Sequence, residues 1–260
     1  MQFRVLRPRL QVVGDDGTLV PIPQALPRGA ISTLLVFEGQ PLTRLELMEL
    51  IWAQPVAGGR LRTCLYEVRR AIGKNRLVWN GGAYRLLLEE TDWCDLTEFH
   101  ATTKNADQAL QRQDLPAAAQ LLDRALRLWH DKPLQDLPDT PAAIEAATAI
   151  TEEMRQARDT LVTLKIELEQ FRDLVGPLTA VTEAEPLNEE AWAHLMTALY
   201  QCGRQAEALH AYHRAHKALQ EANVEPGEHL RQLRRQIQAR DPALDRPSRT
   251  ARTRETNRRT

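Results

Sequence analysis

The stretch from Gly58 to Leu88 limits most strongly what this chain can fold into. Four apolar residues recur there at positions i, i+4, i+7 and i+11: Leu61, Leu65, Val68 and Ile72. This spacing places one apolar stripe along a helix. Gly73 follows, and glycine takes the left-handed conformation that ends a helix without steric cost. The pattern therefore predicts a helix that begins near Gly58 and stops at Gly73.

A β-hairpin is predicted directly after this helix. Two short runs of β-forming residues, Leu77 to Trp79 and Tyr84 to Leu88, flank Asn80-Gly81-Gly82. Tight hairpin turns need positive φ angles, which asparagine and glycine adopt most readily. A solvent-facing helix that runs into a hairpin suits a helix in the DNA major groove with a wing beside it.

The charge of this helix supports the same interpretation. Residues 58–76 contain six Lys or Arg and one acid, a net charge of +5, whereas the whole chain carries −1. Arginines on an isolated helix are more often just a solvated face. Positive charge concentrated in a near-neutral chain, however, is what neutralisation of phosphates requires.

These observations predict a set of DNA-binding residues. We expect Arg62, Thr63, Tyr66 and Arg69 in the major groove, and Arg70, Arg76 and Asn80 at phosphates or the adjacent minor groove. Arg60, on the flank near the helix start, completes the set. Glu67 opposes it, because a carboxylate near phosphates costs affinity, although it could accept from a cytosine amine.

The preceding residues predict strands and two more helices. The first 23 residues alternate as half-buried strands do, and Pro21 and Pro23 confine the last of them to an edge, since proline cannot donate to a ladder. Residues 26–53 hold two helices. Thr43 and Glu46 form a capping-box pattern at the start of the second.

The composition changes after Asp92. The net charge is +3 for residues 1–92, −7 for residues 93–240 and +3 for residues 241–260. The middle region is rich in Ala, Leu, Glu and Gln and is expected to be nearly all helix. Residues 241–260 hold six arginines without apolar periodicity, which predicts a disordered basic tail.

The middle region also repeats itself. Its clearest unit runs from Glu189 to Ala215, with weaker units before it. We expect the following residues to form its core: Trp192, Leu195, Leu199, Ala208 and Tyr212. The spacing resembles the tetratricopeptide repeat, in which small and large residues interlock two antiparallel helices. A generic helical bundle is the alternative.

Both halves carry motifs of known families. Leu42 to Leu47, Leu65 to Ile72 and Gly82 to Leu86 resemble the OmpR/PhoB-type winged helix. In the second half the motifs are Leu126 to Trp129, Pro133-Leu134, Glu185 to Trp192, Gly203 to Leu209 and Pro226 to Leu230. The layout is similar to that of SARP-type antibiotic regulatory proteins with their bacterial transcriptional activator domain, over roughly residues 1 to 238.

The resemblance implies a mainly α fold with a small β component. Residues 1–92 are then a winged helix-turn-helix DNA-binding domain, and residues 93–240 an all-α tetratricopeptide-like activator domain. It also implies a sequence-specific transcriptional activator that binds promoter direct repeats side by side as a dimer and recruits RNA polymerase. Base preference does not carry over, because Tyr66-Glu67 stands where the family usually has polar or basic residues.

Other classes of protein find little support in the sequence. There is no phosphate-binding glycine loop, no Cys-x-x-Cys pair and no apolar run as long as a membrane span of about 20 residues. The three distant cysteines suggest reduced thiols in a cytoplasmic protein. We therefore expect no enzyme activity, cofactor or metal. His210, His213 and His216 fan around a helix, so at most one pair could share a metal.

One alternative function stays open. A non-enzymatic adaptor could carry a degenerate winged helix without DNA affinity and bind a protein partner through its helical repeats. Glu67 and the net negative charge favour this alternative, and the basic helix with its hairpin favours DNA binding.

Overall fold

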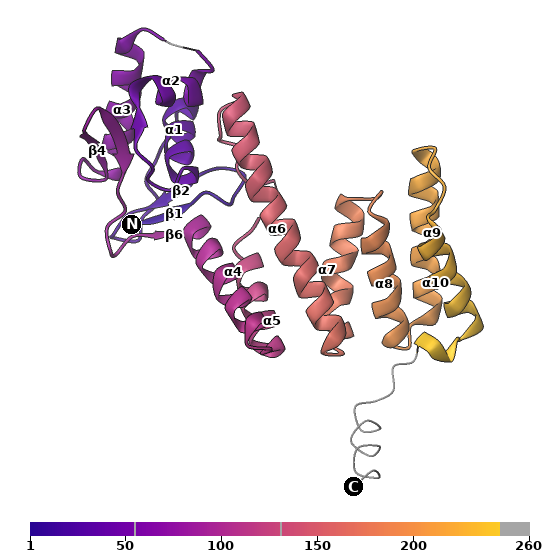
Figure 1. Ribbon diagram of the computed structural model, residues 1–260. Coiled ribbons are helices and arrows are strands. Elements are labelled where there is room, and N and C mark those ends of the chain that lie inside the picture. Colours follow the sequence, from indigo (N-terminus) through magenta and orange to yellow (C-terminus); the bar gives the residue numbers. More distant parts are fainter. Residues whose placement is uncertain (55, 131, 245–260) are drawn as a thin grey trace. The chain divides into compact units, whose positions relative to one another are not determined.

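The computed structural model describes residues 1–54, 56–130 and 132–244, and the chain forms two compact units (Figure 1). The first is Met1–Leu161 and the second begins at Val162. The described residues contain ten α-helices and six short strands. The prediction of a mainly α fold with a small β component is thus confirmed.

The first sheet joins residues that lie far apart in the sequence. Strand β1 (Gln2–Arg4) pairs antiparallel with β2 (Gln11–Val13) and parallel with β6 (Trp93–Cys94). The carboxylate of Asp95 accepts hydrogen bonds from the N–H groups of Val5 and Leu6 at 2.8 and 3.0 Å. Residues beyond position 92 therefore complete the sheet at the start of the chain.

The predicted strand around Leu19 to Ile22 is reduced to one isolated bridge between Val13 and Leu19. Pro21 and Pro23 lack the N–H that a ladder needs, and residues 20–24 run without regular structure. The segment leads into helix α1 (Ala25–Val36).

The next elements follow the predicted order: α2 (Arg44–Trp52), α3 (Gly58–Ile72), β4 (Leu77–Asn80) and β5 (Ala83–Leu86). The short strand β3 (Leu42–Thr43) pairs with β5, which pairs with β4. The capping box is present, because Thr43 Oγ1 accepts from Glu46 N–H and Glu46 accepts from Thr43 N–H.

Helix α3 buries the predicted stripe together with Cys64, against α1 and the hairpin. Gly73 ends it with φ +90° and ψ 151°, so the positive φ is as expected but the backbone is extended rather than left-handed helical. In the hairpin turn, Gly81 and Gly82 both have positive φ, at 60° and 85°. A side chain would strain either position.

Three helices, joined by loops, follow in the first unit. Helices α4 (Asp95–Gln111) and α5 (Leu115–Leu126) pack on each other, and Asp114 caps α5 by accepting from Ala117 N–H. Helix α6 (Pro141–Glu167) begins in the first unit and ends in the second.

The described part of the second unit, residues 162–244, is helical. It contains α7 (Phe171–Ala184), α8 (Glu189–Gln201), α9 (Gln205–Glu221), α10 (Glu228–Ala239) and a 3₁₀ turn (Pro242–Leu244). Neighbouring helices pack side by side along the unit (Figure 1). The five predicted core residues are all buried in it: Trp192, Leu195, Leu199, Ala208 and Tyr212. Most of the predicted basic tail, residues 245–260, lies outside the described residues.

Candidate nucleic-acid interface

The solvent-facing side of α3 carries most of the predicted DNA-binding residues. Arg60, Arg62, Thr63, Tyr66 and Arg70 are exposed, and 63% of the Tyr66 surface is accessible although it is a large aromatic residue. The opposite side packs into the core. Burial of one side fixes the helix, and polar and cationic groups project from the other side.

Arg69 connects α3 to the hairpin. It is half-buried, its Nε donates to the carbonyl of Leu77 at 3.1 Å, and its guanidinium lies 6.0 Å from the ring centre of Tyr84. Tyr84 in turn packs on Trp79, with ring centres 4.4 Å apart. Arg69 therefore braces the hairpin against the helix, a role that the sequence spacing did not indicate.

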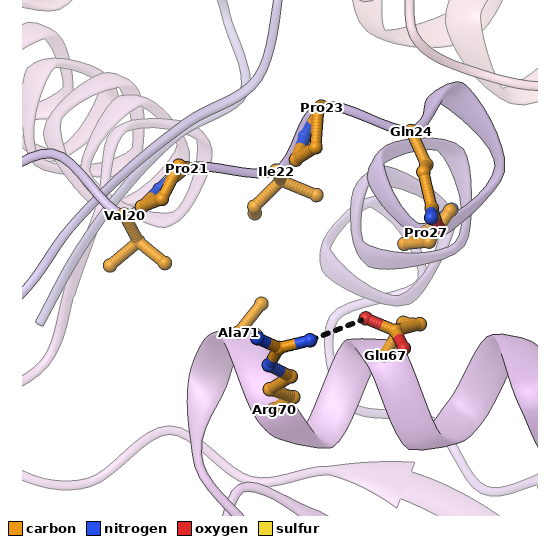
Figure 2. A pocket seen from close by; sticks show the side chains of 9 residues that line it. All are labelled: Val20, Pro21, Ile22, Pro23, Gln24, Pro27, Glu67, Arg70 and Ala71. Atoms are coloured by element: carbon orange, nitrogen blue, oxygen red, sulfur yellow. Dashed lines mark ion pairs between the residues drawn. The ribbon is translucent and has the colours of Figure 1, made fainter.

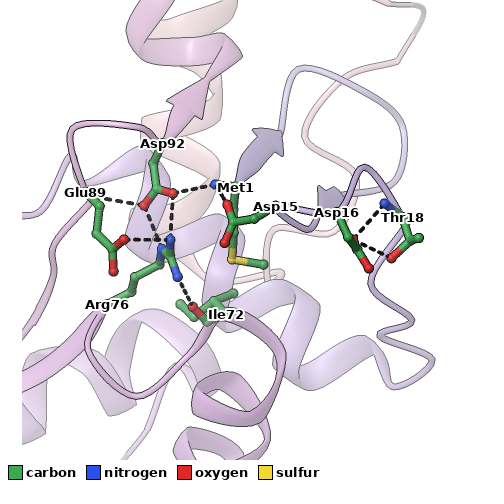
Figure 3. A network of polar contacts seen from close by, with 8 residues as sticks. All are labelled: Met1, Asp15, Asp16, Thr18, Ile72, Arg76, Glu89 and Asp92. Atoms are coloured by element: carbon green, nitrogen blue, oxygen red, sulfur yellow. Dashed lines mark hydrogen bonds and ion pairs between the residues drawn. The ribbon is translucent and has the colours of Figure 1, made fainter.

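Arg76 does not lie on this surface. It is buried, and its guanidinium donates to Asp92 twice, at 2.6 and 2.8 Å, and to the carbonyl of Ile72 at 3.1 Å (Figure 3). Glu89 contacts it at 3.2 Å. Because these partners occupy the guanidinium, we remove Arg76 from the set of DNA-binding residues.

Asp92 is the centre of this polar network. Burial by itself raises the pKa of Asp92, but hydrogen bonds from Arg76, the Met1 ammonium and Glu89 N–H outweigh it and lower the pKa to about 2. The same contact raises the pKa of Arg76. The pair fixes the end of α3 and the start of the hairpin relative to β6.

A pocket lies between α3 and the segment that precedes α1. It has a volume of about 400 Å³ and lies between the Val20 to Gln24 segment with Pro27 on one side and Glu67, Arg70 and Ala71 on the other (Figure 2). Glu67 and Arg70 form an ion pair at 3.8 Å. The Arg70 side chain is 74% exposed, so this contact leaves it open to solvent, where such pairs contribute little.

Sequence reasoning missed Arg44, the first residue of α2. A Cβ atom built on Gly58 would lie 1.9 Å from the Arg44 guanidinium, so this cation lies directly over the start of α3. No side chain caps that start, and its first turn holds no acid. The glycine pair Gly58-Gly59 was the available signal, since glycine permits close approach to a backbone.

Asn80 lies at the tip of the hairpin and is exposed, next to the positive-φ turn. Trp79, the residue before it, is 51% exposed. The hairpin thus exposes one polar and one aromatic side chain to solvent.

The described part of the chain offers few candidates for a reactive thiol or a metal site. Burial raises the pKa of the Cys64 and Cys94 thiols to about 11, which keeps both protonated and unreactive. Among residues 1–54, 56–130 and 132–244, no group of three His, Cys, Asp or Glu side chains is placed to hold a metal ion. The same residues include no helix long and apolar enough to cross a bilayer.

Comparison with known proteins identifies the family. The bacterial transcriptional activator domain matches residues 94–238. The regulatory protein DnrI of Streptomyces peucetius is 30% identical over 262 residues, which cover 95% of each chain. The chain belongs to the SARP family of transcriptional activators.

Further relatives of this SARP-family chain are longer. The regulatory protein AfsR of Streptomyces griseus is 32% identical over 95% of this chain, which spans about a quarter (26%) of AfsR. A solved structure of Mycobacterium tuberculosis EmbR in complex with low affinity phosphopeptide superposes with a TM-score of 0.73. It is 27% identical, and the match covers 93% of this chain and 65% of that one.

Proposed function

We propose that this SARP-family chain is a sequence-specific DNA-binding activator whose residues 1–92 act as a winged helix. The observation that carries the proposal is α3 itself, which buries one apolar side and exposes cationic and polar groups beside a hairpin. An exposed helix of this kind fits the major groove, and the hairpin tip reaches the neighbouring minor groove.

The proposed contacts follow from exposure. Arg62, Thr63 and Tyr66 read base edges in the major groove. Arg60, Arg70 and Asn80 hold phosphates or the minor groove, and Arg44 adds a cation at the start of α3. Arg69 supports the hairpin and contributes to binding through that support.

Two copies would bind side by side on direct repeats. A single DNA-binding module buries roughly 600–1,000 Å² on DNA, which limits its affinity. A second copy in the same orientation doubles the contact area. Footprinting on a selected site is expected to protect two tandem half-sites, and one isolated half-site or an inverted repeat would contradict the arrangement.

The helical residues 93–240 are proposed as an activation domain for RNA polymerase. Their net charge of −7 disfavours contact with DNA. Helical repeats of the tetratricopeptide type expose a continuous surface for protein partners, because each repeat buries its core only against its neighbours. The family supports polymerase as the partner.

The experiment that tests the proposal is selection of DNA sites by the full chain, followed by gel shifts at two salt concentrations. A DNA-binding protein is expected to enrich one sequence and to lose affinity steeply with salt, because phosphate contacts release counterions.

The second candidate function is a protein-binding adaptor with a degenerate winged helix. The Glu67–Arg70 ion pair favours it, since it places a carboxylate on the proposed DNA-facing helix. Failure to enrich any sequence at low salt would favour the adaptor over the activator.

A further inference from the structure

The loop between α5 and α6 is held down on the proposed DNA-binding half of the first unit. We refer to its residues 132–140 as the strap. Leu134 N–H donates to the carbonyl of Arg7 at 3.1 Å, and Thr140 Oγ1 donates to the carbonyl of Leu50, in α2, at 2.9 Å. Leu134 and Thr140 are both buried. The strap thus contacts both the strand region and α2.

Asp136 is the central polar contact of the strap. Its Oδ1 accepts from Arg28 Nε at 2.9 Å, and its Oδ2 accepts from Leu10 N–H at 2.7 Å. The side chains of Asp136 and Arg28 are only 11% and 9% exposed. A carboxylate that satisfies two donors in a nearly closed site fixes their relative positions.

Arg28 extends this contact to the flank of α3. Its Nη1 donates to the carbonyls of Ile22 and Pro23 at 2.9 and 2.8 Å. Those two residues form the wall of the pocket that faces Glu67 and Arg70 on α3 (Figure 2). One guanidinium therefore binds the strap on one side and, on the other, the segment that flanks α3.

The absence of a side chain at Gly29 allows the strap to lie close to α1. A Cβ atom built on Gly29 would lie 2.9 Å from the carbonyl oxygen of Asp136. This atom belongs to backbone, which cannot move away as a flexible side chain can. The strap therefore lies against the first turns of α1, the helix that packs on α3.

We propose that Asp136 and Arg28 are positioning residues through which the activator region sets the DNA affinity of α3. They do not touch DNA. They hold α1 and the Ile22–Pro23 segment in place against α3, so that its exposed side is ordered before DNA arrives. Without the pair, that ordering has to occur on binding and its free-energy cost lowers the affinity. The inference rests on the proposed DNA-binding function.

The test compares two DNA duplexes, one with the site selected by the unsubstituted full chain and one with that site scrambled. We expect Asp136→Asn to lower affinity for the selected site roughly 5- to 150-fold, the range of ordinary coupling between sites. Affinity for the scrambled duplex is expected to stay unchanged or rise slightly, because it depends on exposed cations alone.

Glu98→Gln is the matched control. It also removes one negative charge and breaks an ion pair in the same unit, that of Glu98 with Arg124 at 2.6 Å, which contains an exposed arginine. We expect it to leave both affinities unchanged. Arg28→Lys keeps the charge but cannot bind both Asp136 and the two carbonyls, so it is expected to lower site affinity as Asp136→Asn does.

Each outcome has one meaning. An equal loss on both duplexes, or thermal unfolding of both variants below the assay temperature, would show a merely structural role and overturn the inference. Unchanged site affinity in both variants would overturn it too, with DNA binding itself intact. If the unsubstituted chain selects no site, the proposed function fails and the inference fails with it.

Discussion

Gly58 lacks a side chain at the point where the Arg44 guanidinium approaches the start of α3, and we propose that this cation contacts DNA. The Arg44 guanidinium occupies the place where a Cβ atom would be. Because the end of a flexible side chain can move away, Gly58→Ala is expected to displace Arg44 and leave the fold intact. Alanine also favours the helix over glycine, by up to about 1 kcal/mol. We therefore expect an unchanged or raised melting temperature together with weaker DNA binding, as measured by thermal denaturation and gel shift.

A double-mutant cycle separates the effect of Gly58 from other causes. If the loss of affinity arises only through Arg44, Gly58→Ala is expected to have no further effect in an Arg44→Ala background. Additive losses would show that the new methyl group itself disturbs DNA binding and that the position of Arg44 is unimportant.

The Asp92 carboxylate gives the first unit a defined response to acid. Its pKa is lowered from 3.8 to about 2 in the folded chain, so its stabilisation is present above pH 3.8 and is lost as pH falls through 2. Two units of pKa correspond to on the order of 2 kcal/mol. Asp92→Asn is expected to cost about that much at pH 7 in urea unfolding, with the difference from the unsubstituted chain shrinking toward pH 2.

The titration of Asp95 does not interfere with the comparison between Asp92→Asn and the unsubstituted chain. Burial raises its pKa to about 6, so its own effect on stability has the opposite sign and falls in a higher pH range. It titrates in both proteins and cancels in the comparison. A difference that stayed constant down to pH 2 would contradict the role given to Asp92.

Among the structural elements, α3 and the hairpin are proposed to bind DNA together. Substitutions of two arginines of α3, Arg62 and Arg69, are expected to affect DNA binding differently. Arg62 is exposed, and Arg62→Ala is expected to cost ~1–3 kcal/mol of binding at one base pair, as loss of a bidentate arginine–guanine contact does. Arg69 braces the hairpin, so Arg69→Ala is expected to weaken binding across all sequences and to lower stability. If Arg69→Ala instead weakened binding at one base pair only, Arg69 would be a residue that contacts bases directly.

Trp192 packs helix α8 into the core of the second unit, as the apolar stripe of α3 packs that helix into the first unit. Trp192 is 2% exposed, its Nε1 donates to the carbonyl of Pro186 at 3.0 Å, and the guanidinium of Arg214 lies 5.2 Å from its ring centre. Trp192→Ala is expected to destabilise the second unit by ~3–5 kcal/mol. Denaturant unfolding followed by circular dichroism measures this, and a loss below 1 kcal/mol would contradict a core position.

At the scale of the whole molecule, the compact first unit extends well beyond the winged-helix boundary that sequence analysis suggested. It runs to Leu161 and includes β6, Asp95 and the strap. A fragment of residues 1–92 lacks all three, so we expect weak DNA binding and low stability from it. A fragment of residues 1–161 is expected to bind DNA nearly as well as the full chain.

Activation is expected to require more than DNA binding. In transcription with purified RNA polymerase, the full chain is expected to activate and residues 1–92 to fail. Full activation by residues 1–92 would show that the helical region does not contact polymerase.

Features that depend on neighbours a few positions away could be predicted from the sequence. The apolar stripe of α3, the capping box at Thr43 and the positive-φ turn at Gly81-Gly82 all follow from local periodicity or turn chemistry. Such signals act within one or two turns of chain, so no distant segment has to be known to recognise them.

The partners of the charged side chains could not be predicted in this way, because they depend on how distant segments pack. Arg76 looks like any other cation of a basic stretch, yet Asp92, 16 positions away, binds it in the interior. Arg28 carries no local signal at all, and its partner Asp136 is 108 positions distant. A long charged side chain reaches whichever acceptor the fold brings near it, and that acceptor is set by the packing of elements that sequence periodicity does not place relative to one another.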